Sequence, residues 1–257
     1  MGCRAAPLAA IAPALAGCAG ELSALDPAGP AAAEVAVLWW VMLAGAAAIL
    51  AGVMGAALYA LKAERGGRDF SVRRVLIGWG LVFPTLTMGA LLAFALIGGE
   101  RLIARGDADD AIRVTARQWS WVVDYPGGQR TLGVIHVPAG RDFTIALTSE
   151  DVIHSFWVPR LGGKMDAIPG KENRIRLHAD EPGVYHGLCA EYCGIGHALM
   201  PFEVHAHAPA AYDAALAADA APAGLDNPVL NPREAPAAGV IGRWTDYLRD
   251  WLGLGAR

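Results

Sequence analysis

The sequence predicts a two-helix transmembrane hairpin followed by an all-β sandwich. Two long runs without charged residues, Val35–Leu61 and Val75–Ile97, predict the membrane part. Short β-prone runs separated by Pro- and Gly-containing turns, between residues 111 and 207, predict the sandwich. The hydrophobic content of 54% is higher than in an ordinary soluble protein and fits this division. The net charge of −4 gives no sign of nucleic-acid binding.

Residues 1–18 have the pattern of a processing signal. Arg4 supplies positive charge, and the apolar run at 5–16 is too short and too interrupted by proline to span a bilayer. The run ends in Leu15-Ala16-Gly17-Cys18, which resembles a bacterial lipoprotein signal whose cysteine, Cys18, becomes the lipidated N-terminus. An ordinary signal peptide and an uncleaved tail are the alternatives. Residues 19–34 are rich in Ala, Pro and Gly, and we expect them to form a periplasmic linker.

The hairpin is predicted to occupy residues 35–98, with helices at about 35–61 and 75–97. The two uncharged runs are 27 and 23 residues long, and a membrane helix needs about 20. The segment 62–74 between them carries five basic and two acidic residues. Short basic loops stay in the cytoplasm, so both flanks of the hairpin are expected on the outer, oxidising side.

The sandwich is predicted to occupy residues 108–207 and to be antiparallel, because its β-prone runs are short and are separated by regular turns. These runs are Ile112–Thr115, Trp119–Tyr125, Leu132–Val137, Phe143–Thr148, Phe156–Val158, Arg174–Leu177, Val184–Leu188 and Phe202–Val204.

A tail of low complexity follows at residues 208–257. Near its end, Ile241–Leu254 alternates aromatic and apolar residues with charged ones at helical spacing. This pattern predicts an amphipathic helix on the membrane or on a partner, and a tail helix without function is the alternative.

The segment 189–200 concentrates the chemistry of the chain. Within twelve residues it holds two thiols, one imidazole and one thioether, a set that favours copper, with zinc and iron–sulfur clusters as competitors. His154, 35 residues before Cys189, can be returned to the segment by the intervening β-structure. These donors are too many for one blue-copper ion and suit two copper ions that share two thiolates. The candidate ligand side chains are His154, Cys189, Cys193, His197 and Met200.

A local disulfide is the alternative for the cysteine pair, but a disulfide requires neither the histidine nor the methionine beside it. The other five histidines have no partner at ligand spacing, and we expect them to be surface or structural residues: His136, His178, His186, His205 and His207.

The spacing Cys-x-Glu-x-Cys-x-x-x-His-x-x-Met resembles subunit II of cytochrome c oxidase, of the bacterial, copper-containing type. The His154 segment, the stretches Gln118-Trp119-Ser120-Trp121 and Lys164–Gly170, and the two leading helices support the resemblance, which covers about residues 35–207. It implies a Greek-key cupredoxin sandwich with a binuclear CuA centre. It also implies a location in the bacterial inner membrane, with the copper domain in the periplasm.

The same resemblance implies a function and partners. The chain would accept electrons from cytochrome c and pass them to haem in subunit I, where oxygen is reduced to water. It would therefore be part of a proton-translocating oxidoreductase, and this chain alone would reduce no oxygen. Subunit I, subunit III, cytochrome c and membrane lipid are the implied partners.

Residue roles follow from the same motif. Cys189 and Cys193 would bridge two coppers, one completed by His154 and Met200. The other would be completed by His197 and the carbonyl of Glu191. The side chain of Glu191 would face a magnesium or manganese ion shared with subunit I, with a solvated carboxylate as the alternative. Lys164 and Asp166 would lie near that subunit interface, or else form a surface ion pair.

Trp119 matches the tryptophan at which the family receives its electron, whereas Trp121 is expected in the core. The two share strand parity, so alternation alone does not choose between them. Three acids are candidates for docking a basic cytochrome c, with ordinary solvated carboxylates as the alternative: Asp124, Glu150 and Asp151.

One departure from the family concerns proton uptake. The family commonly has a glutamate near the start of the second helix, but residues 72–80 hold no acidic residue, and Arg73 and Arg74 stand there instead.

Three rival functions remain as alternatives. The first is a membrane-anchored copper chaperone, and the second is a quinol oxidase subunit II, which lacks the copper ligands. The third is the CuA domain of a nitrous-oxide reductase, which normally lacks the hairpin.

Overall fold

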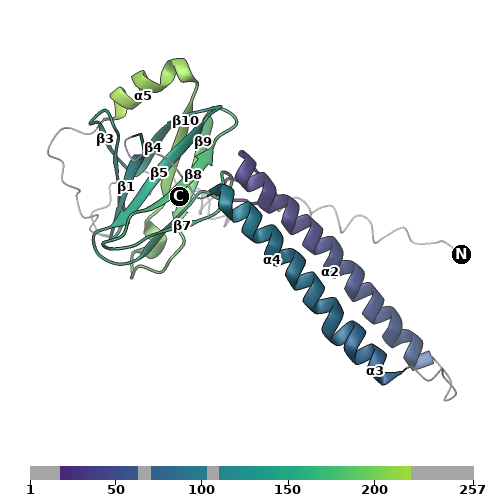
Figure 1. Cartoon of the computed structure of the whole chain (residues 1–257). Coiled ribbons are helices and arrows are strands. Elements are labelled where there is room, and N and C mark those ends of the chain that lie inside the picture. The colour runs from purple at the N-terminus through teal and green to yellow at the C-terminus, as the bar shows by residue number, and fades with distance from the viewer. Residues whose placement is uncertain (1–17, 63–70, 103–109, 221–257) are drawn as a thin grey trace, which may run out of the picture. The chain divides into compact units, whose positions relative to one another are not determined.

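The computed structural model describes residues 18–62, 71–102 and 110–220, and these fall into two compact units. One unit, residues 37–101, is helical, and the other combines the N-terminal segment with residues 102 onward. Residues 1–17 of the predicted signal at 1–18, most of the basic loop and the tail from 221 onward lie outside the described residues. The predicted fold class, two long apolar helices followed by a β-sandwich, is confirmed (Figure 1).

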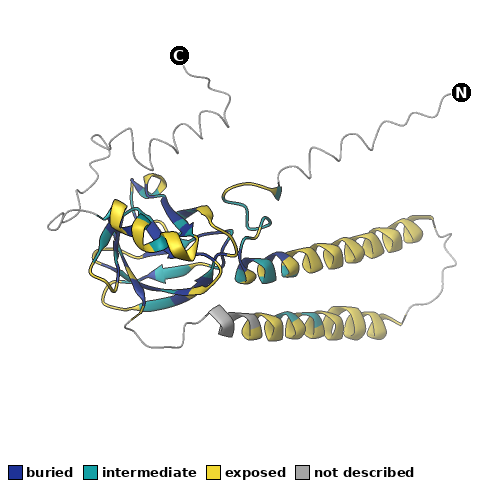
Figure 2. Ribbon diagram, turned by 90° about the horizontal axis from the view of Figure 1, so that it is seen from above, coloured by how far each residue is buried: buried dark blue, intermediate teal, exposed yellow. Residues whose placement is uncertain are grey.

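The helical unit contains most of α2 (Pro30–Lys62) and of a second helix built from three consecutive segments. These are α3 (Val72–Arg74), the π-helical turns η3 (Val75–Val82) and α4 (Phe83–Leu102). Both helices are long and apolar enough to cross a membrane. Their apolar side chains are exposed within the part of the chain that the structure describes, as Figure 2 shows.

The sandwich consists of two five-stranded sheets, ordered β3-β2-β1-β5-β8 and β4-β10-β9-β6-β7. The strands are β1 (Ile112–Arg117), β2 (Ser120–Asp124), β3 (Arg130–Leu132), β4 (Val134–Pro138), β5 (Asp142–Ser149), β6 (His154–Trp157), β7 (Met165–Ala167), β8 (Asn173–His178), β9 (Gly183–Cys189) and β10 (Phe202–His207).

Two strand pairs differ from the predicted antiparallel arrangement, because β1 pairs with β5 and β4 pairs with β10 in parallel. The chain crosses between sheets instead of forming only hairpins. Gly133, at a φ of 69°, is one such crossing, since β3 before it and β4 after it belong to different sheets. Its amide donates to the backbone carbonyl of Trp121 in one sheet, and its carbonyl accepts from the backbone amide of Glu203 in the other.

The space between the sheets is filled by the alternate, inward-facing residues of both. Trp121, Phe156 and Phe202 form its aromatic centre, with ring centroids 4.4–5.9 Å apart. Trp121 is 1% exposed, which confirms the prediction that it is a core residue.

The segment before α2 packs against the sandwich, although its composition predicts a linker. The amide of Ala28 donates to the carbonyl of Arg160 (2.7 Å), and the carbonyl of Ala28 accepts from the amide of Asp180 (3.0 Å). Gly29 lies so close to His178 that an added Cβ would come within 2.2 Å of its carbonyl oxygen. The helix begins at Pro30, five residues before the uncharged run, because proline suits a first helical turn.

Candidate metal centre

The backbone brings His154 to the cysteine loop through the pairing of two strands. His154 begins β6, and β6 lies antiparallel to β9 with Phe156 opposite Cys189. The loop between β9 and β10 holds the remaining candidate ligands and includes the short 3-10 helix η4 (His197–Leu199). A segment far upstream and one short loop thus meet at the same end of the sandwich.

The two cysteines are buried, free thiols. Their sulfur atoms lie 3.9 Å apart, about twice the length of a disulfide bond. The alternative of a local disulfide therefore does not describe this structure. A pair of unbonded sulfurs at this separation can take metal ions between them.

Four further donors surround the sulfur pair. His154 Nδ1 lies 3.9 Å from Cys189 Sγ, and the carbonyl oxygen of Glu191 lies 3.2 Å from it. His197 Nδ1 and Met200 Sδ lie 3.5 and 3.8 Å from Cys193 Sγ. The structure therefore brings together every ligand that the sequence predicts, with an imidazole beside each thiol. The ligand atoms of His154, Cys189 and Cys193 all lie within 4.8 Å of one another.

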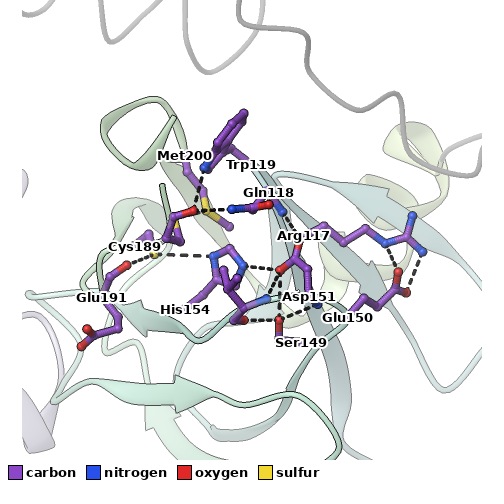
Figure 3. Close-up of polar contacts among 12 residues, drawn as sticks. Arg117, Gln118, Trp119, Ser149, Glu150, Asp151, His154, Cys189, Glu191 and Met200 are labelled. Atoms are coloured by element: carbon purple, nitrogen blue, oxygen red, sulfur yellow. Dashed lines mark hydrogen bonds and ion pairs between the residues drawn. The ribbon is translucent and has the colours of Figure 1, made fainter. Parts of the chain in front are cut away.

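Asp151 holds the imidazole of His154 in place, as Figure 3 shows. His154 Nε2 donates to Asp151 Oδ1 (2.8 Å), which leaves the lone pair on Nδ1 directed at Cys189. The amides of Gln118 and Val152 donate to the same carboxylate, each at 2.6 Å. Burial would raise the pKa of Asp151, but these hydrogen bonds outweigh it and hold the pKa below its ordinary value.

The thiols resist carrying two charges at once. Burial raises the pKa of both, but contacts with His154 and with two backbone groups, which stabilise the thiolate, bring the pKa of Cys189 down to about 7. For Cys193, burial and the adjacent Cys189 charge together raise the pKa to about 12. A second thiolate therefore requires compensating positive charge, which bound metal ions provide. The donor set fits copper, since it is soft sulfur and imidazole with weak thioether and carbonyl donors.

Gln118 and Trp119 hold the cysteine loop from the other sheet. Gln118 Nε2 (2.7 Å) and Trp119 Nε1 (3.1 Å) both donate to the carbonyl of Cys193. The indole of Trp119 lies against Gly196, where an added Cβ would come within 2.2 Å of the ring. Trp119 is half-buried and lies in the turn between β1 and β2, so strand parity does not apply to it.

The aromatic core supports the far end of the loop. Trp121 Nε1 donates to the carbonyl of Met200 (3.2 Å), and both residues are almost fully buried. The ring of Trp121 also meets that of His154 edge-on, with centroids 6.1 Å apart. The side chain of Trp121 therefore contacts two of the candidate ligands, His154 and Met200.

The predicted docking acids all have partners in the chain. Asp124 accepts from Arg130 Nε (2.6 Å), and Glu150 pairs with Arg117. Asp151 is engaged with His154, a role that sequence reasoning missed because nothing in the spacing distinguishes it from its neighbour Glu150.

The residues expected at a subunit interface lie on the surface. Lys164 is exposed and Asp166 is half-buried on β7. The side chain of Glu191 is exposed and points away from the sulfur pair in Figure 3, while its carbonyl oxygen faces Cys189.

Three of the histidines that we expected to be surface or structural residues lie together in one cluster. The ligand atoms of His136, His205 and His207 lie within 4.8 Å of one another, because β4 and β10 pair side by side. The other two are surface residues with acidic partners: His178 contacts Asp142, and His186 contacts Glu21.

Known proteins with similar sequences were found over much of the chain. Residues 127–207 match the family described as cytochrome C oxidase subunit II, periplasmic domain. A cytochrome c oxidase subunit 2 of Alkalihalophilus pseudofirmus is 36% identical over 218 residues, which cover 78% of this chain and 63% of the relative. That of Thermostichus vulcanus is 41% identical over 106 residues, which cover 41% of this chain and 32% of the relative. The alignments thus span less than two thirds of these curated relatives.

Among solved structures, the periplasmic domain of subunit II of cytochrome oxidase from Bradyrhizobium japonicum is similar, with a TM-score of 0.41 and 29% sequence identity. The match covers 44% of this chain and 95% of that one.

Proposed function

Because the chain belongs to the cytochrome c oxidase subunit II family, we propose that it accepts electrons from cytochrome c at a two-copper centre. It passes them to haem in subunit I, where oxygen is reduced to water. The observation that carries this proposal is the buried pair of free sulfurs 3.9 Å apart with one imidazole beside each.

Six residues would hold the copper: the side chains of His154, Cys189, Cys193, His197 and Met200, and the carbonyl of Glu191. When bound, the copper pair would supply one-electron chemistry shared between two ions. The protein supports this site from behind at three places. Asp151 orients His154, Trp121 fixes the backbone at Met200, and Gln118 fixes it at Cys193.

Trp119 is the proposed point of electron arrival. Its indole is half-buried, so part of it faces solvent, and its N–H donates directly to the carbonyl of the ligand Cys193. A short path through one hydrogen bond thus joins a surface accessible to cytochrome c to the sulfur pair. Glu150, Asp151 and Asp124 are the acids proposed to lie near the docking cytochrome, although each is partly neutralised by its own partner.

The proposed partners follow from the exposed groups. Subunits I and III and membrane lipid would cover the apolar faces of the two helices. Glu191, whose carboxylate is exposed, would bind a magnesium or manganese ion shared with subunit I, beside Lys164 and Asp166. Lipidation of Cys18, at the start of the described chain, would add a second anchor, and the sandwich would lie in the periplasm.

The rivals fit the site less well. A quinol oxidase subunit II lacks the copper ligands, and all of them are present here. A copper chaperone requires a site that exchanges its ion readily, whereas Cys189, Cys193, His154 and Met200 are at most 3% exposed.

The test is the copper content and electron spin resonance of the full chain purified in detergent. Two coppers per chain, with hyperfine splitting from an electron shared by two equivalent copper nuclei, are expected. One copper per chain, with splitting from a single nucleus, would overturn the proposal in favour of a blue-copper or chaperone site.

A further inference from the structure

We propose that His136, His205 and His207 form a second metal site, for a borderline divalent cation such as Zn²⁺, on the outer face of the β4–β10 pair. The site shares no residue with the cysteine loop. Met200, the last candidate copper ligand, precedes β10. At a rise of roughly 3.3 Å per residue, His205 and His207 lie about 10 and 17 Å along the strand from its first residue, Phe202.

Strand alternation gathers the three imidazoles. On β10, Phe202, Val204 and Ala206 face the core, so the residues between them face outward. On β4, which is parallel to β10, His136 lies directly opposite His205. Three histidines therefore lie next to one another on one face of two neighbouring strands, because His207 is only two residues beyond His205.

Two of the three ring separations match those of imidazoles around one ion, and the third is slightly longer. The ring centroid of His136 lies 5.1 Å from that of His207 and 5.5 Å from that of His205. The centroids of His205 and His207 are 6.3 Å apart. Imidazoles bound to one Zn²⁺, with Zn–N bonds of about 2.0–2.1 Å, have centroids roughly 5–6 Å apart. His136 Nδ1 and His207 Nε2 already face each other at 2.8 Å, so only a small separation is needed to admit an ion.

Two carboxylates direct the rings as metal sites require. His136 Nε2 donates to Asp219 on α5 (Tyr212–Asp219) at 3.0 Å, and His205 Nε2 donates to Glu203 at 2.8 Å. In each ring this hydrogen bond fixes the proton on Nε2 and leaves the lone pair on Nδ1. Carboxylate–histidine pairs of this kind orient the ligands in many metal sites.

The charges of the cluster also suit a cation. The carboxylate of Glu203 is only 3% exposed, and a positive ion next to its histidine partner would compensate for the cost of that burial.

An ion could reach the site from solvent. The side chain of His136 is 4% exposed beneath α5, but that of His205 is 27% exposed and His207 is half-buried. Three nitrogen ligands with one side open leave a fourth position for water or for a carboxylate.

The experiment uses the full chain, purified without a polyhistidine tag and with the cysteine site already filled with copper. Equilibrium dialysis against Zn²⁺, followed by elemental analysis, should find one zinc per chain in addition to the copper. His205→Ala and His207→Ala should each weaken zinc binding by at least about tenfold, since each removes one of three ligands. Both residues are partly exposed, so the fold should survive, and the unchanged copper spectrum checks this.

His178→Ala is the matched control, because His178 also lies on a strand with a carboxylate partner, Asp142 at 2.8 Å, but outside the cluster. It should keep the zinc. Equal zinc binding by His205→Ala and the unaltered chain, or no zinc beyond the copper, would overturn the proposal and show that the three histidines form only a hydrogen-bonded network.

Discussion

The Asp151 carboxylate accepts a hydrogen bond from His154 at 2.8 Å, on the ring nitrogen opposite the one that faces Cys189. This contact makes Asp151 part of the metal centre without being a ligand. The side chain of Gln118 holds the Cys193 loop, and its backbone N–H donates a hydrogen bond to the same carboxylate. One side chain thus connects the ligand from β6 to the loop that carries the sulfurs.

Asp151→Asn is therefore expected to weaken copper binding. An amide group would place N–H donors against the donors of Gln118, Val152 or His154, so at least one hydrogen bond would be lost. Loss of such an outer contact typically costs 10–100-fold in metal affinity. Competition with a copper chelator would measure it. Glu150→Gln is the control, because Glu150 pairs with Arg117 on the surface, and equal affinities in the two variants would refute the positioning role.

Removal of copper should lower the melting temperature of the sandwich. A ligand that binds only the folded state, at a free concentration 100 times its dissociation constant, stabilises that state by about 2.7 kcal/mol. The copper-free chain must also keep two adjacent buried thiols uncharged or singly charged. Calorimetry before and after chelation tests this, with Cys193→Ser as the control in which chelation should change nothing. An unchanged melting temperature in the unaltered chain would mean that the site is not coupled to folding.

Much of the fold could be predicted from residue patterns, because inward-facing alternation and turn residues are local properties. Nearly every predicted run became a strand, but the run Leu132–Val137 became two. Gly133 turns the chain from one sheet to the other there, and the pattern of apolar residues is unbroken by this change. The strand β7 was missed, since Met165–Ala167 contains an aspartate and a methionine rather than β-branched residues.

The ligand set could be predicted because its spacing within one loop is characteristic, whereas its supports could not. Asp151 looks like any surface acid until β6 and the 149–153 turn are folded. His136 and His205 are far apart in the sequence and meet only through the parallel pairing of β4 with β10, which no local pattern specifies. The docking of Ala28 and Gly29 on the sandwich is likewise a tertiary contact made by an unremarkable segment.

Gly196→Ala is expected to destabilise the loop. The backbone of Gly196, at a φ of −90°, accepts alanine, but the new methyl group would come within 2.2 Å of the Trp119 ring. Relieving such an overlap costs about 1–3 kcal/mol. Gly183→Ala is the control, because an added Cβ there meets nothing closer than 3.8 Å. Denaturant unfolding of both variants measures the difference, and equal midpoints would show that the indole moves aside freely.

Trp119→Phe is expected to slow electron uptake from cytochrome c while leaving the copper spectrum nearly unchanged. Phenylalanine still fills the space against Gly196 but loses the N–H that donates to the Cys193 carbonyl. That hydrogen bond contributes about 1 kcal/mol to stability, so the fold should persist. Stopped-flow mixing with reduced cytochrome c gives the rate.

Trp157→Phe provides the comparison, because Trp157 is also half-buried and donates its N–H to a carbonyl, but to that of Gly162 (3.2 Å) and not to that of a candidate ligand. Its rate should equal that of the unaltered chain. Were Trp119→Phe to alter the copper spectrum as strongly as the rate, Trp119 would be a structural support of Cys193. An electron route through its indole is favoured only if the rate falls alone.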